Sequence, residues 1–411
     1  MNSRERILAA IDHVEPDGVP VDLGATPSSG ISAIAYDRLI KRLQLGNTHN
    51  RVYDVVQQVT QPEIEILDRY RIDVLDIGRA FNTAPDAWYP FTLLDGTVVE
   101  FPTWFRPERQ PDDSFVARRD GEVIARMPSG ANFFDETVWP LIDGYPDSYA
   151  DLGRQMNRVL WQGLAHSPWD NAGDPDFWPR LRQAALHLRE TSDRALMIVC
   201  GCNLFEWGTF LRRLDNFLMD LVTCPAEVER LLDALMERHP ATLKIVCETV
   251  GDLVDILRFG DDLGTDSGPF MSPATYRRLF KPRHTQLCEY VHNHSQMRTF
   301  LHSCGSIYKL MPDLIEAGYD VINPVQITSR DMQPERLKRE FGSDIAFWGG
   351  GCDTRHILPG ATPEQVKDHV RRNIEIFAPG GGFVFNTVHN IMPDVPPENI
   401  IAMFEAVDEY R

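Results

Sequence analysis

The sequence has no long hydrophobic run, no excess of positive charge and few cysteines. No apolar stretch approaches the roughly 20 residues that cross a membrane. The start, MNSRERILAAIDH, reads as an amphipathic helix and not as the apolar core of a signal peptide. Acidic residues outnumber basic ones by 60 to 41, a net charge of −19, which disfavours nucleic acid and anionic membranes as partners. We therefore expect a cytoplasmic protein that acts on a small molecule.

Cysteine is scarce and odd in number. Seven cysteines in 411 residues argue against a disulfide framework and favour thiol or metal chemistry. The sequence also lacks internal repeats and the glycine-rich phosphate loop that would favour an open, doubly wound sheet. With 43% hydrophobic and 25% charged residues, the composition is that of a globular protein with a large core.

Short apolar runs alternate with amphipathic helices through the second half of the chain. This alternation is typical of βαβ units that build a parallel sheet. Three earlier apolar runs complete the eight strands that close a (β/α)8 barrel, so we predict an α/β TIM barrel in which residues 1–411 form a single domain. The predicted strands are Val19–Leu23, Val74–Ile77, Leu196–Val199, Val254–Phe259, Thr299–Ser303, Asp320–Pro324, Ile345–Trp348 and Phe383–Asn386.

One stretch in the N-terminal third breaks this alternation. Residues from about 85 to 130 contain TLLDGTVVEF and FVARRDGEVIARM, and each surrounds an Asp-Gly turn in a pattern that predicts an antiparallel β-hairpin. We expect this segment to be an insertion at the barrel rim that shapes the pocket. The tryptophan- and proline-rich segment 161–178 has two interpretations, a further cap over the same opening or ordinary loop packing.

His302, Cys304 and Cys352 are the strongest candidates for a metal site. Side chains alternate along a strand, so His302 and Cys304 point the same way from one strand end. Cys352 ends the strand two further on, which contributes to the same barrel layer. One imidazole and two thiolates suit Zn2+ and leave an open fourth position, as in catalytic zinc sites. The alternative is that all three are ordinary buried residues, but glycines beside both cysteines favour the metal site.

Carboxylates after two other predicted strands are candidates for acid–base chemistry. Glu206 follows a strand end among apolar residues, where burial would raise its pKa, or it faces solvent at a helix start. Asp261 and Asp262 follow another strand, with Asp266 close behind, and the alternative for all three is loop or helix capping. We predict catalytic roles for Glu206, Asp261 and Asp262, and substrate binding by Asp266.

Amide and imidazole side chains complete the polar residues at the predicted strand ends. Asn323 lies at the end of VIN, before a proline, and Asn386 and His389 lie in FNTVHN. We predict that these three residues bind substrate, with Asx turns as the alternative.

The chain resembles the uroporphyrinogen decarboxylase superfamily, and specifically its zinc-dependent methyltransferase branch. The resemblance is carried by NSRERILAAIDHVEPDGVPVDLG, FGDDLGTDSGPFMSPATYRRLFKP, LHSCGSIYKLMPDLIEAGYDVINPVQ, WGGGCDT and FNTVHNIMPDVPPENI. It implies a (β/α)8 barrel, zinc bound by a His-x-Cys pair and a distant Cys that match His302, Cys304 and Cys352, and methyl transfer involving a corrinoid (cobalamin). The Asp-x-His-x-x-Gly motif that binds cobalamin is missing, so the corrinoid would come from a partner protein.

The resemblance leads to one hypothesis of function and several alternatives. We expect a corrinoid-dependent methyltransferase of the O-demethylase type, which takes a methyl group from a small donor such as an aryl methyl ether. The alternatives are methyl transfer from methylcobamide to a thiol, a zinc lyase or hydrolase that cleaves an ether without corrinoid, and a barrel without metal or catalysis. Porphyrinogen decarboxylation is disfavoured, because ATPSSGISAIAY has no arginine to bind an acidic tetrapyrrole. The sequence leaves a homodimer open.

Overall fold

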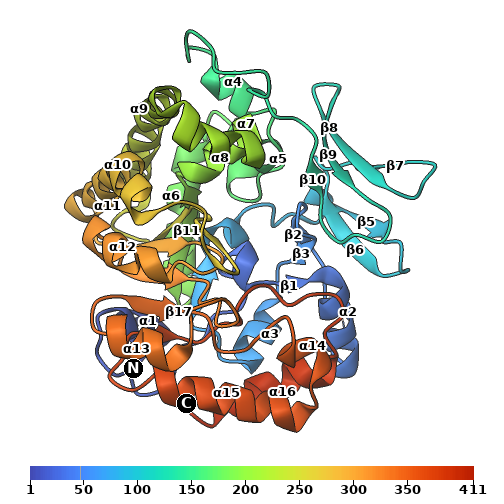
Figure 1. Ribbon diagram of the computed structural model, residues 1–411. Coiled ribbons are helices and arrows are strands. Elements are labelled where there is room, and N and C mark those ends of the chain that lie inside the picture. Colours follow the sequence, from blue (N-terminus) through green and yellow to red (C-terminus); the bar gives the residue numbers. More distant parts are fainter. Residues whose placement is uncertain (47) are drawn as a thin grey trace.

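A curled parallel β-sheet surrounded by helices forms the centre of the molecule in the computed structural model, which describes residues 1–46 and 48–411 (Figure 1). Seven strands run in the order β18-β17-β16-β15-β12-β11-β4. The protein therefore has the TIM-barrel-like α/β fold that the sequence predicted. The strands are β4 (Val74–Asp76), β11 (Ala195–Gly201), β12 (Ile256–Gly260), β15 (Arg298–His302), β16 (Val321–Asn323), β17 (Ala346–Trp348) and β18 (Phe383–Val384).

The segment predicted as the first strand takes the eighth place, between the two edge strands. Val21 forms a parallel bridge with Phe385, directly after β18, and its carbonyl oxygen accepts a hydrogen bond from the Asp73 amide. The Asp73 carboxylate accepts a hydrogen bond from the Val21 amide at 2.8 Å. Arg6 and Arg411 both pair with this buried carboxylate, so residues near both ends of the chain hold the barrel closed.

Alternate side chains of the strands point into the barrel, and near the amino ends of the strands they are apolar. The first helix, α1 (Ser3–Ile11), joins the same buried cluster and closes this end of the barrel. Its position follows from its apolar face and from the Asn2–Glu5 capping box at its start. The inward cluster includes Ile7, Ala10, Val74, Met197, Ile256, Phe300, Val321, Ala346 and Val384.

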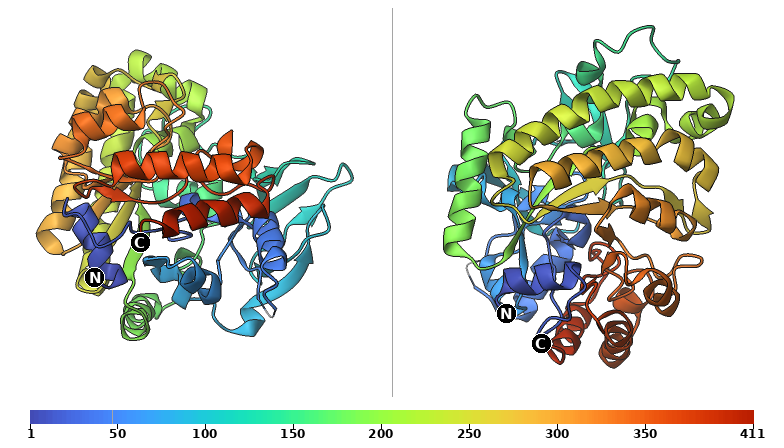
Figure 2. Two further views of the ribbon diagram at one scale, coloured as in Figure 1. Left: turned by 90° about the horizontal axis from the view of Figure 1, so that it is seen from below. Right: turned by 90° about the vertical axis from the view of Figure 1, so that its left-hand side faces the viewer.

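Helices cover the outside of the sheet and pack against its outward-facing apolar residues. Figure 2 shows the last two long helices, α15 and α16, lying side by side along one edge of the barrel. None of the described helices is long and apolar enough to cross a membrane. The main helices are α2 (Ala33–Arg42), α3 (Ile64–Arg69), α6 (Phe177–Thr191), α7 (Phe205–Arg212), α8 (Leu214–Thr223), α9 (Pro225–Val250), α10 (Pro273–Leu279), α11 (Lys281–His294), α12 (Met311–Ala317), α13 (Pro334–Phe341), α14 (Ile357–Gly360), α15 (Pro363–Phe377) and α16 (Pro397–Asp408).

Antiparallel strands between β4 and β11 lie beside the barrel (Figure 1). The strands β5 (Trp88–Thr92) and β6 (Val98–Pro102) pair around one Asp-Gly turn, and β8 (Phe115–Arg119) and β9 (Glu122–Met127) pair around the other. Both predicted hairpins are therefore confirmed. That residues 85–130 are an insertion within a single domain stays a prediction.

The hairpins pack on a core of their own. Phe101, Phe105, Phe115 and Phe134 belong to an apolar cluster that is distinct from the barrel core. This cluster borders an apolar cavity of about 200 Å3, which we call the hairpin cavity. The remaining strands are β1 (Ile31–Ser32), β2 (Val52–Asp54), β3 (Val59–Thr60), β7 (Glu108–Arg109), β10 (Asp135–Glu136), β13 (Gly264–Thr265) and β14 (Gly268–Pro269), and the short helices α4 (Leu152–Met156) and α5 (Leu160–Gly163) lead back to the barrel.

Candidate metal centre and active-site cavity

Inward-facing side chains change from apolar to polar toward the carboxyl ends of the strands. Ile256 belongs to the apolar cluster, and Arg258 is the next residue of β12 with the same orientation. Phe300 is followed in the same way by His302 on β15. His302 lies opposite Asn323 of β16 in the parallel register. The polar side chains of successive strands therefore meet at this end of the barrel, where TIM-barrel enzymes have their active sites.

A cavity of about 610 Å3 opens at this end, and we call it the central cavity. Its lining includes tryptophans from the segment 161–178, so this segment contributes to the cavity wall; that it caps the opening stays a prediction. Among the described residues, none from 85–130 lines it, so the hairpins do not shape the pocket as we expected; they pack on their own aromatic cluster. The tryptophans of the wall are Trp161, Trp169, Trp178 and Trp207, and the ionisable residues of the floor are Glu206, Arg258, Asp262, His302 and His389.

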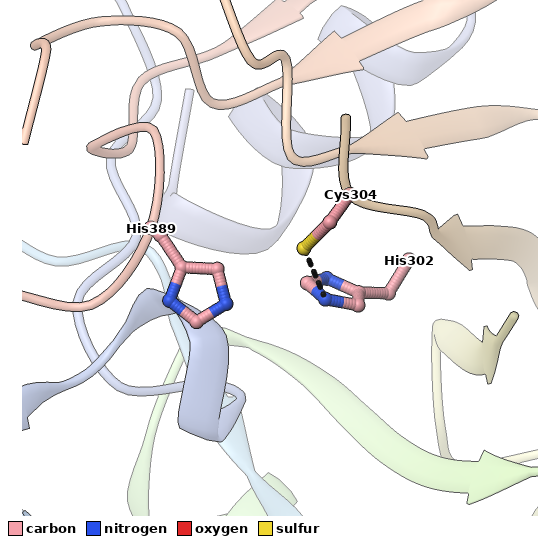
Figure 3. A group of neighbouring side chains, drawn as sticks. All are labelled: His302, Cys304 and His389. Atoms are coloured by element: carbon pink, nitrogen blue, oxygen red, sulfur yellow. Dashed lines mark hydrogen bonds between the residues drawn. The ribbon is translucent and has the colours of Figure 1, made fainter. Parts of the chain in front are cut away.

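His302, Cys304 and His389 form a group that can hold a metal ion (Figure 3). One ligand atom of each residue lies within 4.8 Å of the others, and His302 Nε2 lies 3.5 Å from Cys304 Sγ. Bonds of zinc to imidazole nitrogen and thiolate sulfur are about 2.0–2.3 Å long, which places two tetrahedral ligand atoms about 3.5 Å apart. Imidazole and thiolate are also donors that zinc prefers, so the residues present fit a zinc ion.

Hydrogen bonds determine which nitrogen of His302 faces this group. Asn323 Nδ2 donates to the carbonyl oxygen of Trp348 at 2.8 Å, so Asn323 Oδ1 is free to accept. This oxygen lies 2.7 Å from His302 Nδ1, which therefore carries the proton. The lone pair of Nε2 then points toward Cys304, as a metal ligand requires. Burial lowers the pKa of His302 well below its usual value, which keeps the imidazole neutral.

His389 is oriented in the same manner by the residue that follows it. Asn390 Nδ2 donates to Gln57 Oε1 at 3.4 Å, and Asn390 Oδ1 lies 2.8 Å from His389 Nδ1. Nδ1 is thus the protonated nitrogen, and Nε2 keeps its lone pair. The ring faces His302 and Cys304 in Figure 3. A residue predicted to bind substrate therefore lies in the place of a third metal ligand.

Cys352, the predicted third ligand, is outside this group in the described part of the chain. Its side chain is fully buried, and its Sγ lies 4.0 Å from the carbonyl oxygen of Asp353. Its backbone forms a bridge with Thr387, two residues before His389. The cysteine thus lies beside the loop that carries His389 but offers its sulfur elsewhere, and its role as a ligand stays a prediction.

Glu206 and Asp262 bring two carboxyl groups to the floor of the central cavity. Asp262 Oδ1 accepts a hydrogen bond from the Cys304 amide at 2.8 Å and lies 3.8 Å from His302 Nε2. Burial raises the pKa of Glu206 well above its usual value, and the negative charges of Asp262 and Asp261 raise it further. Burial also raises the pKa of Asp262. Both shifts favour a protonated carboxyl group in this pair, which is the form that a general acid needs.

Asp261, the third predicted catalytic carboxylate, has a different place. Its two oxygens accept hydrogen bonds from the amides of Phe205 and Glu206 at 3.0 and 2.8 Å, which caps the start of α7. His284 Nε2 lies 3.1 Å from the same carboxylate. Asp261 is fully buried and outside the lining of the central cavity. It positions Glu206 and does not face the substrate space.

The remaining predicted substrate-binding residues support the structure around the cavity. Asn323 orients His302, as described above. Asn386 Nδ2 donates to the carbonyl oxygen of Asp22 at 3.3 Å. Asp266 pairs with Arg355 at 2.8 Å and accepts from Gln326, and its side chain is 64% exposed. Of the four residues predicted to bind substrate, only His389 lines the described cavity.

Arg258 and Asn390 are functional candidates that the sequence analysis overlooked. Arg258 interrupts the apolar run VDILRF at an inward-facing position. A charged residue inside a buried strand is rare without a partner or a pocket, so this signal was present in the sequence. Asn390 directly follows His389, and its contact with the ring depends on the fold of the loop.

Comparison with known proteins identifies the family. A family model described as Uroporphyrinogen decarboxylase (URO-D) matches residues 202–410. The chain is 32% identical over 97 residues to a uroporphyrinogen decarboxylase of Methylococcus capsulatus, 24% of this chain and 26% of that protein. It is 25% identical over 185 residues to the methylcobamide:CoM methyltransferase MtaA of Methanosarcina barkeri, 44% of this chain and 49% of that protein. The chain thus matches half or less of the length of these relatives.

A solved structure shares the fold over the full length. The methyltransferase from Methanosarcina mazei aligns with 100% of this chain and 99% of its own, with a TM-score of 0.58 and 15% sequence identity. The stretch matched by the family model is just over half of the chain and contains Glu206, Asp262, His302, Cys304 and His389. From its fold, its site and this match, the chain belongs to the uroporphyrinogen decarboxylase (URO-D) family.

Proposed function

We propose that this protein is a zinc-dependent methyltransferase that moves a methyl group from an aryl methyl ether to a corrinoid on a separate protein. The observation that carries the proposal is the donor group of His302, Cys304 and His389, whose two histidines line a cavity with tryptophan walls. A cavity of about 610 Å3 is of the size that holds small organic ligands. The partial sequence similarity to the methylcobamide:CoM methyltransferase MtaA supports the same proposal.

Zinc would be held by Nε2 of both histidines and by Sγ of Cys304. When bound, it supplies a Lewis acid that polarises an ether oxygen and makes the phenolate a better leaving group. Burial and the charges of Asp262 and Glu206 raise the pKa of the Cys304 thiol well above its usual value. The protein alone therefore favours the neutral thiol, and a nearby cation is needed to stabilise the thiolate.

The residues of the chain itself would hold the substrate and move a proton. The tryptophan walls enclose an aromatic ring and exclude water from it. Asn203 Nδ2 donates to Glu206 Oε2, so Oε1 is the oxygen that carries the proton. Glu206 passes this proton to the phenolate oxygen as the methyl group leaves, and Asp262 keeps the Cys304 backbone in place.

The test combines zinc-loaded protein, an aryl methyl ether and a reduced corrinoid protein. We expect methylation of the corrinoid, seen in its absorption spectrum, together with one phenol per methyl group, and only when all components are present. His302→Ala serves as the inactive control. Phenol formed without the corrinoid protein would instead indicate a zinc lyase or hydrolase, and no product from a panel of ethers would contradict the proposal.

A thiol methyltransferase is the second candidate, favoured by the name of the Methanosarcina barkeri relative. The same donor group would then hold a thiol substrate, and methylcobamide would be the methyl donor. Thioether formation from a thiol and methylcobamide, with no demethylation of ethers, would select this candidate. Porphyrinogen decarboxylation is less well supported, because Arg238 and Arg258 are the only arginines among the described residues of the cavity lining.

A further inference from the structure

Arg258 places a positive charge in the lining of the central cavity, and it has no ion-pair partner among the described residues. Its Nε is buried and has no hydrogen-bond partner. Within the described residues, no carboxylate lies within 4.0 Å of its guanidinium, although ion pairs are common elsewhere in the molecule. A buried guanidinium without a partner is costly, so its presence here indicates a ligand that completes its contacts.

The surroundings of Arg258 leave its charge available. Glu206 and Asp262 line the same cavity, but in the described part of the chain neither carboxylate lies within the ion-pair distance of 4.0 Å of the guanidinium. The cavity therefore presents a guanidinium whose Nε has no hydrogen-bond acceptor among the described residues.

Arg258 and the proposed metal ligands lie at neighbouring levels of the barrel. Arg258 lies opposite Phe300 in the parallel register, two residues below His302 on the neighbouring strand. Two residues of a strand span roughly 7 Å along the backbone, and both Arg258 and His302 line the central cavity. One small substrate bound there can therefore contact the guanidinium and the metal ligands together.

We propose that Arg258 binds an anionic substituent of the substrate, so that the methyl donor is an aryl methyl ether with a carboxylate group. This inference rests on the proposed function, because the ether supplies the other end of the molecule. The planar guanidinium matches a carboxylate with two parallel hydrogen bonds. A bound ether without a charged group would leave Arg258 unpartnered. The site therefore discriminates against neutral ethers.

Binding of two matched ligands tests the inference without any turnover. The probes are 4-methoxybenzoate and its neutral analogue 4-methoxybenzamide, measured by titration calorimetry on zinc-loaded protein. We expect the wild type to bind the acid at least tenfold more tightly than the amide, and Arg258→Met to bind both within threefold. Equal binding of the two by the wild type, or an undiminished preference in Arg258→Met, would overturn the inference.

Two further variants separate the contact from general effects of charge and fold. Arg355→Met removes a positive charge outside the cavity lining and should keep the full preference. Arg258→Lys keeps the charge without the two parallel donors and should show an intermediate preference, which tests the inference even if Arg258→Met does not fold. If Arg355→Met lost the preference for the acid over the amide as fully as Arg258→Met, this would contradict a direct contact between Arg258 and the carboxylate.

A second pair of ligands distinguishes an anionic ether from an anionic thiol. The probes are 2-mercaptoethanesulfonate and 2-mercaptoethanol. A charge preference confined to this pair would assign Arg258 to a thiol substrate and overturn the ether assignment. A preference for 4-methoxybenzoate that persists when no methyl transfer is found would leave this inference standing while the proposed function fails.

Discussion

The central cavity and the hairpin cavity are both enclosed by aromatic side chains, but they differ in what lies between those side chains. Many ionisable side chains line the central cavity, and they include Glu206 from a helix, Arg258 and His302 from strands, and Asp262 and His389 from loops. The hairpin cavity is lined mainly by phenylalanine, leucine and methionine, with Asp95 as the one ionisable residue of its described lining. Aromatic walls alone therefore do not indicate chemistry in this protein.

Strand geometry accounts for the difference. The parallel strands of the barrel all end at the same place, so the polar residues at their carboxyl ends converge there. The antiparallel hairpins bring alternate carboxyl and amino ends together, and their inward residues form a small apolar core. We infer that the barrel mouth carries the chemistry, whereas the hairpin core contributes stability. The predictions below test this division.

The largest expected effect is on the metal centre. Cys304→Ser should reduce the zinc content from about one per chain to a small fraction and abolish methyl transfer, because a ligand is lost while the large barrel core is kept. Elemental analysis and circular dichroism measure the two properties. Gross unfolding of this variant would show that Cys304 is a structural residue.

The same measurement of zinc content distinguishes His389 from Cys352 as the third ligand. His389→Ala should lose zinc as Cys304→Ser does, since one of its ring nitrogens lies within 4.8 Å of the ligand atoms of His302 and Cys304. Cys352→Ala should keep zinc, because its sulfur is directed toward the carbonyl oxygen of Asp353. The reverse result would confirm the ligand set predicted from the sequence and would mean that the loop after β17, which carries Cys352, rearranges when metal binds.

The next effect concerns the hairpin core. Phe101 is 1% exposed and its ring contacts those of Phe91 and Phe105. Phe101→Ala should lower the free energy of unfolding by about 3–5 kcal/mol, as measured by urea denaturation. The zinc content should be unchanged, since no metal ligand comes from this region. Loss of zinc in this variant would break the proposed division between the two cavities.

Glu206→Gln is expected to have a smaller effect on the free energy of unfolding, and to raise it. Burial raises the pKa of Glu206 in the folded state, so its contribution to stability falls as pH rises above the unfolded value near 4.3. Removing the ionisable group should therefore stabilise the protein at pH 8, with the gain shrinking toward pH 4. Denaturation at both pH values measures this. A gain that does not depend on pH would contradict the assigned cause.

The smallest effect is expected for Asp266→Asn. Asp266 pairs with Arg355 where both side chains are at least half exposed, and such ion pairs contribute about 0–1 kcal/mol. Turnover should change by less than twofold, because the carboxylate lies outside the lining of the central cavity. Steady-state kinetics check this, and a rise in KM alone would restore the substrate-binding role predicted from the sequence.

Much of this protein is determined by the sequence alone. The apolar runs, their spacing and the Asp-Gly turns predicted each strand of the barrel and both hairpins, because period-two burial and turn chemistry are local properties. The His-x-Cys spacing likewise indicated that His302 and Cys304 face the same space, and they do so although β15 ends at His302 and Cys304 follows in the loop.

Contacts between distant segments were decided only by the tertiary structure. The placement of His389 beside His302 depends on how the loop after β18 folds back over the barrel, and the orientation of each ring depends on Asn323 and Asn390. The same holds for Asp261, which caps α7 although its neighbour Asp262 faces the cavity. A one-dimensional pattern shows which residues end each strand, but three-dimensional packing determines which of them share a site.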